Sequence, residues 1–259
     1  MPERVHVERD GTIATVVLDR PEKLNALTRG MWASLGEAVS ALSADDGLRC
    51  VIVRGAGERA FSPGNDIGEF ANERSNKTQA LAYGDVMHGT AKALEECRHP
   101  LVAQIHGICV GGGLEIAALC DFRICGTSSR FGAPIKNLGL VMAYAEMAPL
   151  VRLIGSAAAL ELLLEGRIID AAEAKAMGLV SRVVPDIDVA REARATAERI
   201  AEGAPLVARW HKKFARRLAD PTPLTDAERD ECFDCFDTAD FREGYAAFLS
   251  KRKPGFTGR

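Results

Sequence analysis

The stretch LVAQIHGICVGGGLEIAALCDFRICG, residues 101–126, places a strand, a glycine-rich loop, a helix and a second strand in direct succession. The apolar residues of Leu101–Ile105 predict a buried strand, and the letters from Leu114 to Gly126 predict a helix that runs into the next strand. Buried strands that alternate with helices favour parallel pairing. This stretch therefore predicts an α/β fold.

One carboxylate lies inside this stretch. Glu115 stands between three glycines and the apolar run Ile116–Cys120. An ionised carboxylate in apolar surroundings costs free energy or shifts its pKa unless it is paired. Glu115 is therefore expected to be paired, turned to solvent, or used in chemistry.

The same alternation of strands and helices precedes this stretch. VHVERDGTIATVVLD predicts two short strands joined at Asp10–Gly11. Thr28 is a suitable N-cap for a helix with apolar residues at helical spacing. A buried strand is predicted at Cys50–Val53, and a polar helix at residues 75–97.

The C-terminal quarter differs in composition. Beyond Pro185 no strand pattern is found, and two segments are amphipathic and rich in charge. We therefore divide the chain into a core, residues 1–185, and a helical appendage, residues 186–259. The appendage is expected to pack on a partner subunit or on the core rather than to fold alone.

Composition excludes several classes of partner. Lys and Arg total 33 and Asp and Glu total 36, a net charge of −3, so no global basic field indicates binding to nucleic acid or an anionic membrane. The first residues do not have the pattern of a targeting segment, and no uninterrupted apolar run approaches roughly 18 residues. Seven scattered cysteines fit reduced thiols, which predicts a cytoplasmic protein. Four of them lie in apolar runs: Cys50, Cys109, Cys120 and Cys125.

Two glycine-bearing loops follow predicted strands, FSPGNDIGEF at residues 61–70 and VGGGLEI at residues 110–116. Glycines at the start of a helix leave backbone N–H groups free and allow an oxygen to approach them closely. Two such loops facing each other would form an oxyanion hole. For either loop alone, a tight turn is the better explanation.

Other common site motifs are absent from the sequence. GGG here is not the dinucleotide fingerprint, and no phosphate-binding P-loop is found. Five scattered histidines and a lone CxxC, Cys232 and Cys235, do not form a metal-binding pattern. No metal is expected.

Six motifs, in this order, resemble the crotonase superfamily, also called the enoyl-CoA hydratase/isomerase family, and they cover nearly the whole chain. The motifs are RPEKLNAL (20–27), AFSPGNDI (60–67), HGICVGGGLEIAALCDFRI (106–124), RFGAP (130–134), AKAMGLVSRVVP (174–185) and REGYAAFLSKRKPGF (242–256). The resemblance implies a spiral of ββα units followed by a helical trimerisation region, in a homotrimer or a dimer of trimers. It also implies an acyl-CoA thioester whose oxygen lies between the backbone N–H groups of Asn65 and Gly112. No cofactor is implied, since CoA is part of the substrate.

The resemblance places Glu115 where hydratases of this family keep one of two catalytic glutamates. The second follows the proline of an FGxPE motif, but this chain has FGAPIKNLG, with Ile135 at that place. We expect Ile135 to dry the site and raise the pKa of Glu115. Glu146, 11 residues later, is a candidate for compensating the loss, although a glutamate in the first turn of a helix is also favoured by the helix dipole.

The resemblance also suggests which residues bind CoA. Two come from the early loop, two follow the Asn65 donor, and two come from the tail of a neighbouring subunit. Asp66 is interpreted as a residue that caps its loop rather than as a catalyst. The six positions are Lys23, Leu24, Asp66, Ile67, Phe248 and Lys251.

Three functions remain open from the sequence. The first is an acyl-CoA enzyme of the hydratase/isomerase type that uses Glu115 as acid/base. The second is a decarboxylase or hydrolase on the same scaffold, because an oxyanion hole alone serves such reactions. The third is a non-catalytic acyl-CoA-binding protein, which the Ile135 substitution would permit.

Overall fold

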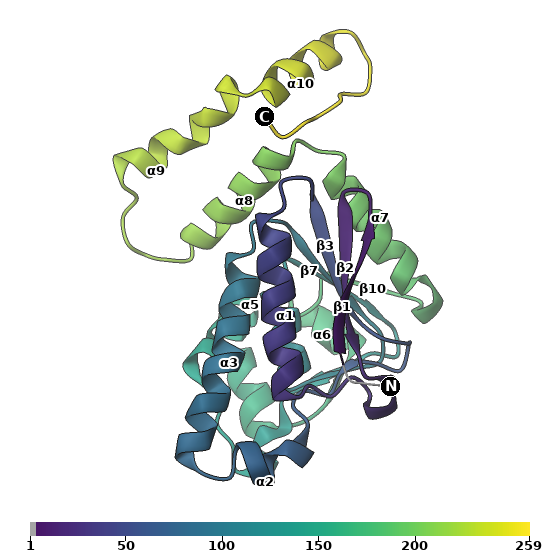
Figure 1. The fold of residues 1–259 in the computed structure, drawn as a ribbon, viewed down its shortest axis with the longest axis vertical. Helices are drawn as coiled ribbons and strands as arrows, with labels where there is room; N and C mark the ends of the chain where they lie inside the picture. The colour runs from purple at the N-terminus through teal and green to yellow at the C-terminus, as the bar shows by residue number, and fades with distance from the viewer. Residues whose placement is uncertain (1–3) are drawn as a thin grey trace.

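The structure, a computed structural model, describes residues 4–259, in which two sheets are surrounded by helices (Figure 1). The larger sheet has the strand order β1-β2-β3-β5-β7-β10, with an antiparallel β1–β2 pair and parallel pairing elsewhere. This confirms the predicted α/β fold. The strands are β1 Arg4–Asp10, β2 Ile13–Asp19, β3 Cys50–Gly55, β5 Leu101–Ile105, β7 Phe122–Gly126 and β10 Arg182–Val184.

The smaller sheet has the order β4-β6-β8-β9, parallel except for the β8–β9 pair. Consecutive strands alternate between the sheets: β3, β5 and β7 enter the larger one, and the strand after each enters the smaller one. A helix follows each pair, so the predicted ββα units are confirmed. The strands are β4 Ala60–Ser62, β6 Ile108–Val110, β8 Arg130–Gly132 and β9 Ile169–Asp170.

Helices pack against both sheets. Thr28 caps the first helix as predicted, since its hydroxyl accepts a hydrogen bond from Met31 N at 3.2 Å. The buried face of that helix, which includes Leu35 and Val39, joins the main apolar core. The helices of this part are α1 Arg29–Ala44, α2 Phe70–Glu73, α3 Lys77–Glu96, α4 Gly112–Leu119, α5 Tyr144–Glu165 and α6 Ala171–Ala176. Short 3-10 turns span Pro21–Lys23, Ile67–Glu69, Pro134–Leu138 and Asp186–Asp188.

One helix of residues 4–259, α5, has the length and hydropathy of a membrane span. Gly155, with φ 77° and ψ 162°, interrupts it. Leu150 and Leu162, on either side of the break, are buried in the core of the protein. Packing inside the fold therefore accounts for part of the apolar composition of α5, in which 28% of the apolar window is buried.

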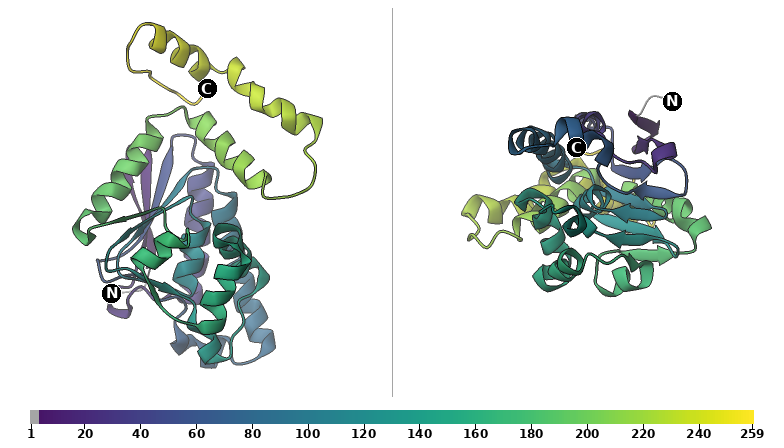
Figure 2. Two further views of the ribbon diagram at one scale, coloured as in Figure 1. Left: turned by 180° about the vertical axis from the view of Figure 1, so that it is seen from behind. Right: turned by 90° about the horizontal axis from the view of Figure 1, so that it is seen from below.

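The first helix of the predicted helical appendage packs on the core. Helix α7, Val189–Ala201, lies on the larger sheet, where Ala193 and Ala197 pack against Ile52 and Val102. This part of the appendage therefore covers one face of the larger sheet. The chain then leaves the core through α8 Pro205–Arg217, α9 Asp226–Asp230, the 3-10 turn Glu231–Asp237 and α10 Ala239–Leu249 (Figures 1 and 2).

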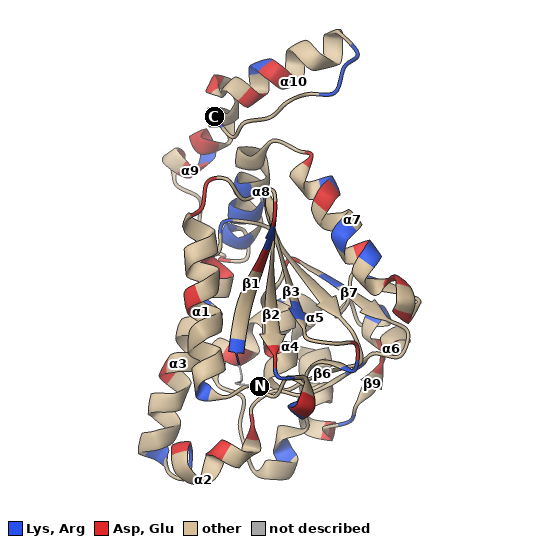
Figure 3. Ribbon diagram, turned by 45° about the vertical axis from the view of Figure 1, so that its right-hand side comes forward, with Lys and Arg blue, Asp and Glu red and all other residues tan. Residues whose placement is uncertain are grey.

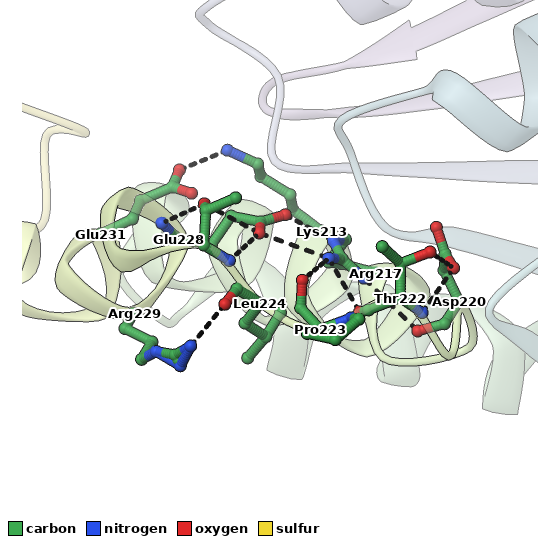
Figure 4. A network of polar contacts seen from close by, with 10 residues as sticks. Lys213, Arg217, Asp220, Thr222, Pro223, Leu224, Glu228, Arg229 and Glu231 are labelled. Atoms are coloured by element: carbon green, nitrogen blue, oxygen red, sulfur yellow. Dashed lines mark hydrogen bonds and ion pairs between the residues drawn. The ribbon is translucent and has the colours of Figure 1, made fainter.

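Helix α8 connects the core and the C-terminal segment, and Lys and Arg residues gather on it (Figure 3). Lys212, 6% exposed at its side chain, donates to Asp121 at 2.7 Å and to the His99 carbonyl at 2.6 Å. Arg217 binds Glu228, and Lys213 binds Glu231, so α8 is tied to the segment that follows (Figure 4). These contacts hold the segment in place without burying its apolar side chains.

The C-terminal segment exposes large apolar side chains. Phe248, for example, is 82% exposed in the single chain. An exposed apolar surface of this kind marks an interaction site in soluble proteins. Its members are Phe233, Phe236, Phe241, Tyr245, Phe248 and Leu249.

Candidate functional site

The two glycine-bearing loops meet. Gly64 adopts φ 96°, and a Cβ atom there would lie 2.7 Å from Gly112 N and 3.1 Å from the Val110 carbonyl oxygen. Gly112 is the first residue of α4, so its N–H points out of the helix start. Within residues 4–259 the N–H groups of Asn65 and Gly112 have no hydrogen-bond acceptor. The structure thus brings two free donors side by side.

The glycine triplet is required for close packing as well as for the turn. A Cβ at Gly112 would lie 2.8 Å from the indole ring of Trp32, and one at Gly113 would lie 2.3 Å from the Ser62 carbonyl oxygen. Gly111 adopts φ 53°, which a side chain disfavours. The start of α4 is therefore held tightly against β4 and α1.

An early loop fixes the Gly64 loop through its backbone. Leu27 N donates to Gly64 O, and Asp66 N donates to Leu27 O, both at 2.8 Å. Asn25, almost fully buried at φ 64°, donates from its amide to Ala60 O at 2.9 Å. Sequence reasoning missed Asn25, and its only signal was an asparagine in a turn-like segment, where left-handed backbone is tolerated.

Asp66 caps the 3-10 turn after the first donor. Its carboxylate accepts from Gly68 N at 2.9 Å and pairs with Arg20 at 2.7 Å. The hydrogen bond from Arg20 is the main reason that the pKa of Asp66 lies below its usual value. The structure also brings Lys23, Leu24 and the exposed Ile67 to these two paired loops. Four of the six predicted CoA positions therefore lie together.

The side chain of Asn65 has its own partners. Trp32 Nε1 donates to Asn65 Oδ1 at 2.6 Å, which fixes the orientation of the amide. The amide nitrogen faces Met87 Sδ at 3.7 Å, a weak acceptor. Asn65 thus supplies its backbone N–H to the donor pair while its side chain is anchored to α1. Trp32 was not identified from the sequence.

The structure brings Glu115 near Glu146. The pKa of Glu115 is raised to about 8, mainly by burial and also by the negative charge of Glu146, while the positive charge of Arg74 lowers it. Glu146 lies in the first turn of α5, is 13% exposed at its side chain, and accepts from Ala143 N at 2.9 Å. His88 Nε2 lies 3.4 Å from its other oxygen. The two carboxylates, which come from different helices, are therefore close enough for their charges to interact.

Ile135 lies in the 3-10 turn Pro134–Leu138 and packs against the apolar core. Its side chain has no polar group. We expected the pKa of Glu115 to be raised, and desolvation is the main cause that raises it.

The raised pKa of Glu115 predicts a pH-dependent stability. The folded protein holds this proton up to about pH 8, whereas the unfolded chain loses it near pH 4.5, so stability falls as pH rises between these values. Glu115→Gln removes this loss. We expect the variant to melt on the order of 2–5 °C above wild type at pH 9 and at the same temperature at pH 5, by calorimetry. An equal difference at both pH values would contradict the assignment.

The structure does not bring Phe248 and Lys251 to this site within one chain. They belong to α10 and the residue pair after it, at the end of the molecule opposite to α2 (Figure 1). Any role in the site requires a second copy of the chain.

All seven cysteines are free thiols. The four predicted buried thiols are buried and free, as is Cys97, while Cys232 and Cys235 are free near the surface. In the part of the chain that the structure describes, no three His, Cys, Asp or Glu side chains are grouped to hold a metal ion.

Comparison with known proteins agrees with this architecture. The family described as Enoyl-CoA hydratase/isomerase matches residues 8–259. The chain is 38% identical over 260 residues to a probable enoyl-CoA hydratase of Mycobacterium bovis, with 99% of each chain covered. It is 31% identical over 259 residues to a crotonyl-CoA hydratase of Syntrophomonas wolfei, also with 99% of each covered.

A solved structure is also very similar. The crystal structure of an enoyl-CoA hydratase/carnithine racemase from Magnetospirillum magneticum superposes with a TM-score of 0.97 at 52% identity, covering 98% of this chain and 96% of the other. Sequence, fold and family match extend over the same residues. The chain therefore belongs to the enoyl-CoA hydratase/isomerase family.

Proposed function

We propose that this protein adds water to the conjugated double bond of enoyl-CoA thioesters. The observation that supports this most is the meeting of two free backbone N–H groups, on Asn65 and Gly112, with the carboxylates of Glu115 and Glu146. Two relatives are named as a crotonyl-CoA hydratase and a short-chain-enoyl-CoA hydratase, which supports the same reaction for this site.

The donor pair would act on the thioester oxygen. When water adds to C3 of an enoyl thioester, negative charge moves onto that oxygen. Fixed N–H donors stabilise such charge, and removal of one typically lowers the rate by about 10²–10³. Because the close packing of Gly64 against Gly112 fixes both donors, no reorganisation is needed when the charge develops.

The two carboxylates would divide the proton transfers. With a pKa of about 8, Glu115 is mainly protonated at pH 7 and can deliver a proton to C2. Glu146, on the neighbouring helix α5, would accept a proton from the attacking water. In this arrangement Glu146 takes over the task that Ile135 cannot perform.

The CoA part would lie along the early loop. Lys23, Leu24 and Ile67 are exposed or half-exposed beside the Asp66 cap, and no cofactor is needed because CoA arrives with the substrate. Phe248 and Lys251 would reach the nucleotide from a neighbouring copy in a homotrimer or a dimer of trimers. The exposed aromatic side chains of the C-terminal segment support such an assembly.

Mass spectrometry of saturated, enoyl and malonyl-type CoA thioesters in deuterated water tests this proposal. We expect the enoyl thioesters alone to gain the mass of one water. Carbon dioxide loss would favour a decarboxylase, and free CoA a hydrolase. Unchanged thioesters that nonetheless raise the melting temperature would identify a binding protein instead.

A further inference from the structure

A cation lies over two aromatic rings between α2 and α3. The guanidinium of Arg74, at the end of α2, lies 4.9 Å from the ring centroid of Phe70 and 4.9 Å from that of Tyr83. Tyr83 is fully buried in α3, so one side of Arg74 is covered by a fixed ring. Stacking on aromatic faces holds a guanidinium in a defined orientation.

This cation has no anionic partner in the described chain. The neighbouring carboxylates are engaged elsewhere: Glu73 pairs with Arg29 at 3.2 Å, and Glu69 accepts from Arg29 N and from the Tyr83 hydroxyl. No carboxylate of residues 4–259 lies within ion-pairing distance of Arg74, which is itself half-buried. A partly desolvated cation without a counter-ion is costly, and a ligand anion would compensate for it.

Arg74 also lies near the donor loop through α3, because Met87, one helical turn after Tyr83, contacts the amide nitrogen of Asn65 at 3.7 Å. Its charge acts on Glu115, although the two groups are too far apart for an ion pair. In the proposed reaction Glu115 acts at the carbon next to the thioester carbonyl. An acyl chain that runs past Glu115 and along this face of α3 would therefore carry its far end toward Arg74.

We propose that Arg74 binds a carboxylate at the far end of the acyl chain, so that the preferred substrates are CoA monothioesters of short unsaturated dicarboxylic acids. A guanidinium binds a carboxylate through two parallel hydrogen bonds, a geometry that a methyl end cannot satisfy. The amide nitrogen of Asn65, which has only a thioether for a partner, is a further donor for a polar chain. This inference rests on the proposed function, because it places the acyl chain at Glu115.

The test compares two five-carbon substrates, glutaconyl-CoA, which ends in a carboxylate, and 2-pentenoyl-CoA, which ends in a methyl group. Wild type is expected to show a kcat/KM at least tenfold higher for glutaconyl-CoA. Arg74→Met should lower that value about 50-fold and change 2-pentenoyl-CoA turnover less than threefold. Arg74→Lys should restore part of the difference. Lys77→Met, which removes an exposed positive charge three residues away, should match wild type.

Two results would overturn the inference. One is a wild-type preference for 2-pentenoyl-CoA, and the other is an equal loss on both substrates in Arg74→Met, which would mean that Arg74 serves only the catalytic carboxylates. If Arg74→Met does not fold, Arg74→Gln replaces it.

Calorimetric binding of the saturated thioesters glutaryl-CoA and pentanoyl-CoA distinguishes failure of the proposed function from failure of this inference. Tighter binding of glutaryl-CoA that depends on Arg74 supports the inference even if neither enoyl substrate is hydrated. Equal binding of the two thioesters contradicts it, whatever the outcome of the turnover assay.

Discussion

Glu115→Gln is expected to lower kcat for enoyl-CoA hydration about 10³-fold, within the range for loss of a general acid or base. The amide cannot exchange a proton with the substrate, whereas the Asn65 and Gly112 donors are untouched, so KM should stay within a few-fold. Loss of absorbance of the conjugated thioester measures both constants. Glu96→Gln is the matched control, because Glu96 lies exposed at the end of α3.

Retention of wild-type kcat in Glu115→Gln would show that this carboxylate is a packed residue with a shifted pKa and no catalytic task. An equal loss in Glu96→Gln would show that the assay reports a change in net charge or folding rather than chemistry.

Gly64→Ala is expected to lower kcat about 10²- to 10³-fold, because a Cβ there would lie 2.7 Å from Gly112 N and force the two donors apart. The matched control is Gly57→Ala. Gly57 has a similar positive φ of 71°, but a Cβ there meets no atom within 4 Å. Both variants force a side chain into left-handed backbone, at a cost of about 1–2 kcal/mol, yet only Gly64→Ala should lose turnover.

Melting temperatures and kcat measured on both glycine variants separate strain from the loss of the donor pair. If Gly64→Ala and Gly57→Ala retained the same turnover, the thioester oxygen would have to bind elsewhere.

The local sequence pattern predicted those elements whose signal lies within a few consecutive residues. The β1–β2 hairpin, the strand Leu101–Ile105 and the Thr28 cap follow from apolar alternation and capping chemistry within a few residues. The meeting of the two glycine-bearing loops came from motif resemblance, because nothing in either loop alone distinguishes a donor pair from a turn.

Contacts between distant segments could not be predicted from the sequence. Trp32 and Asn65 are far apart in the chain, and their hydrogen bond depends on how α1 packs beside the Gly64 loop. The stacking of Arg74 could not be predicted from the sequence, because its partners are aromatic rings rather than charged residues. The sequence left open whether the appendage packs on the core or on a partner, and the small Ala193 and Ala197 let helix α7 lie flat on the sheet.

The rate of crotonyl-CoA hydration by wild type, Glu115→Gln, Glu146→Gln and the double variant tests the central claim most directly. If the two carboxylates act in one step, each single variant should lose about as much kcat as the double variant, since paired catalytic groups are strongly non-additive. Hydration by Glu146→Gln at the wild-type rate would contradict the claim that Glu146 replaces the missing glutamate at Ile135.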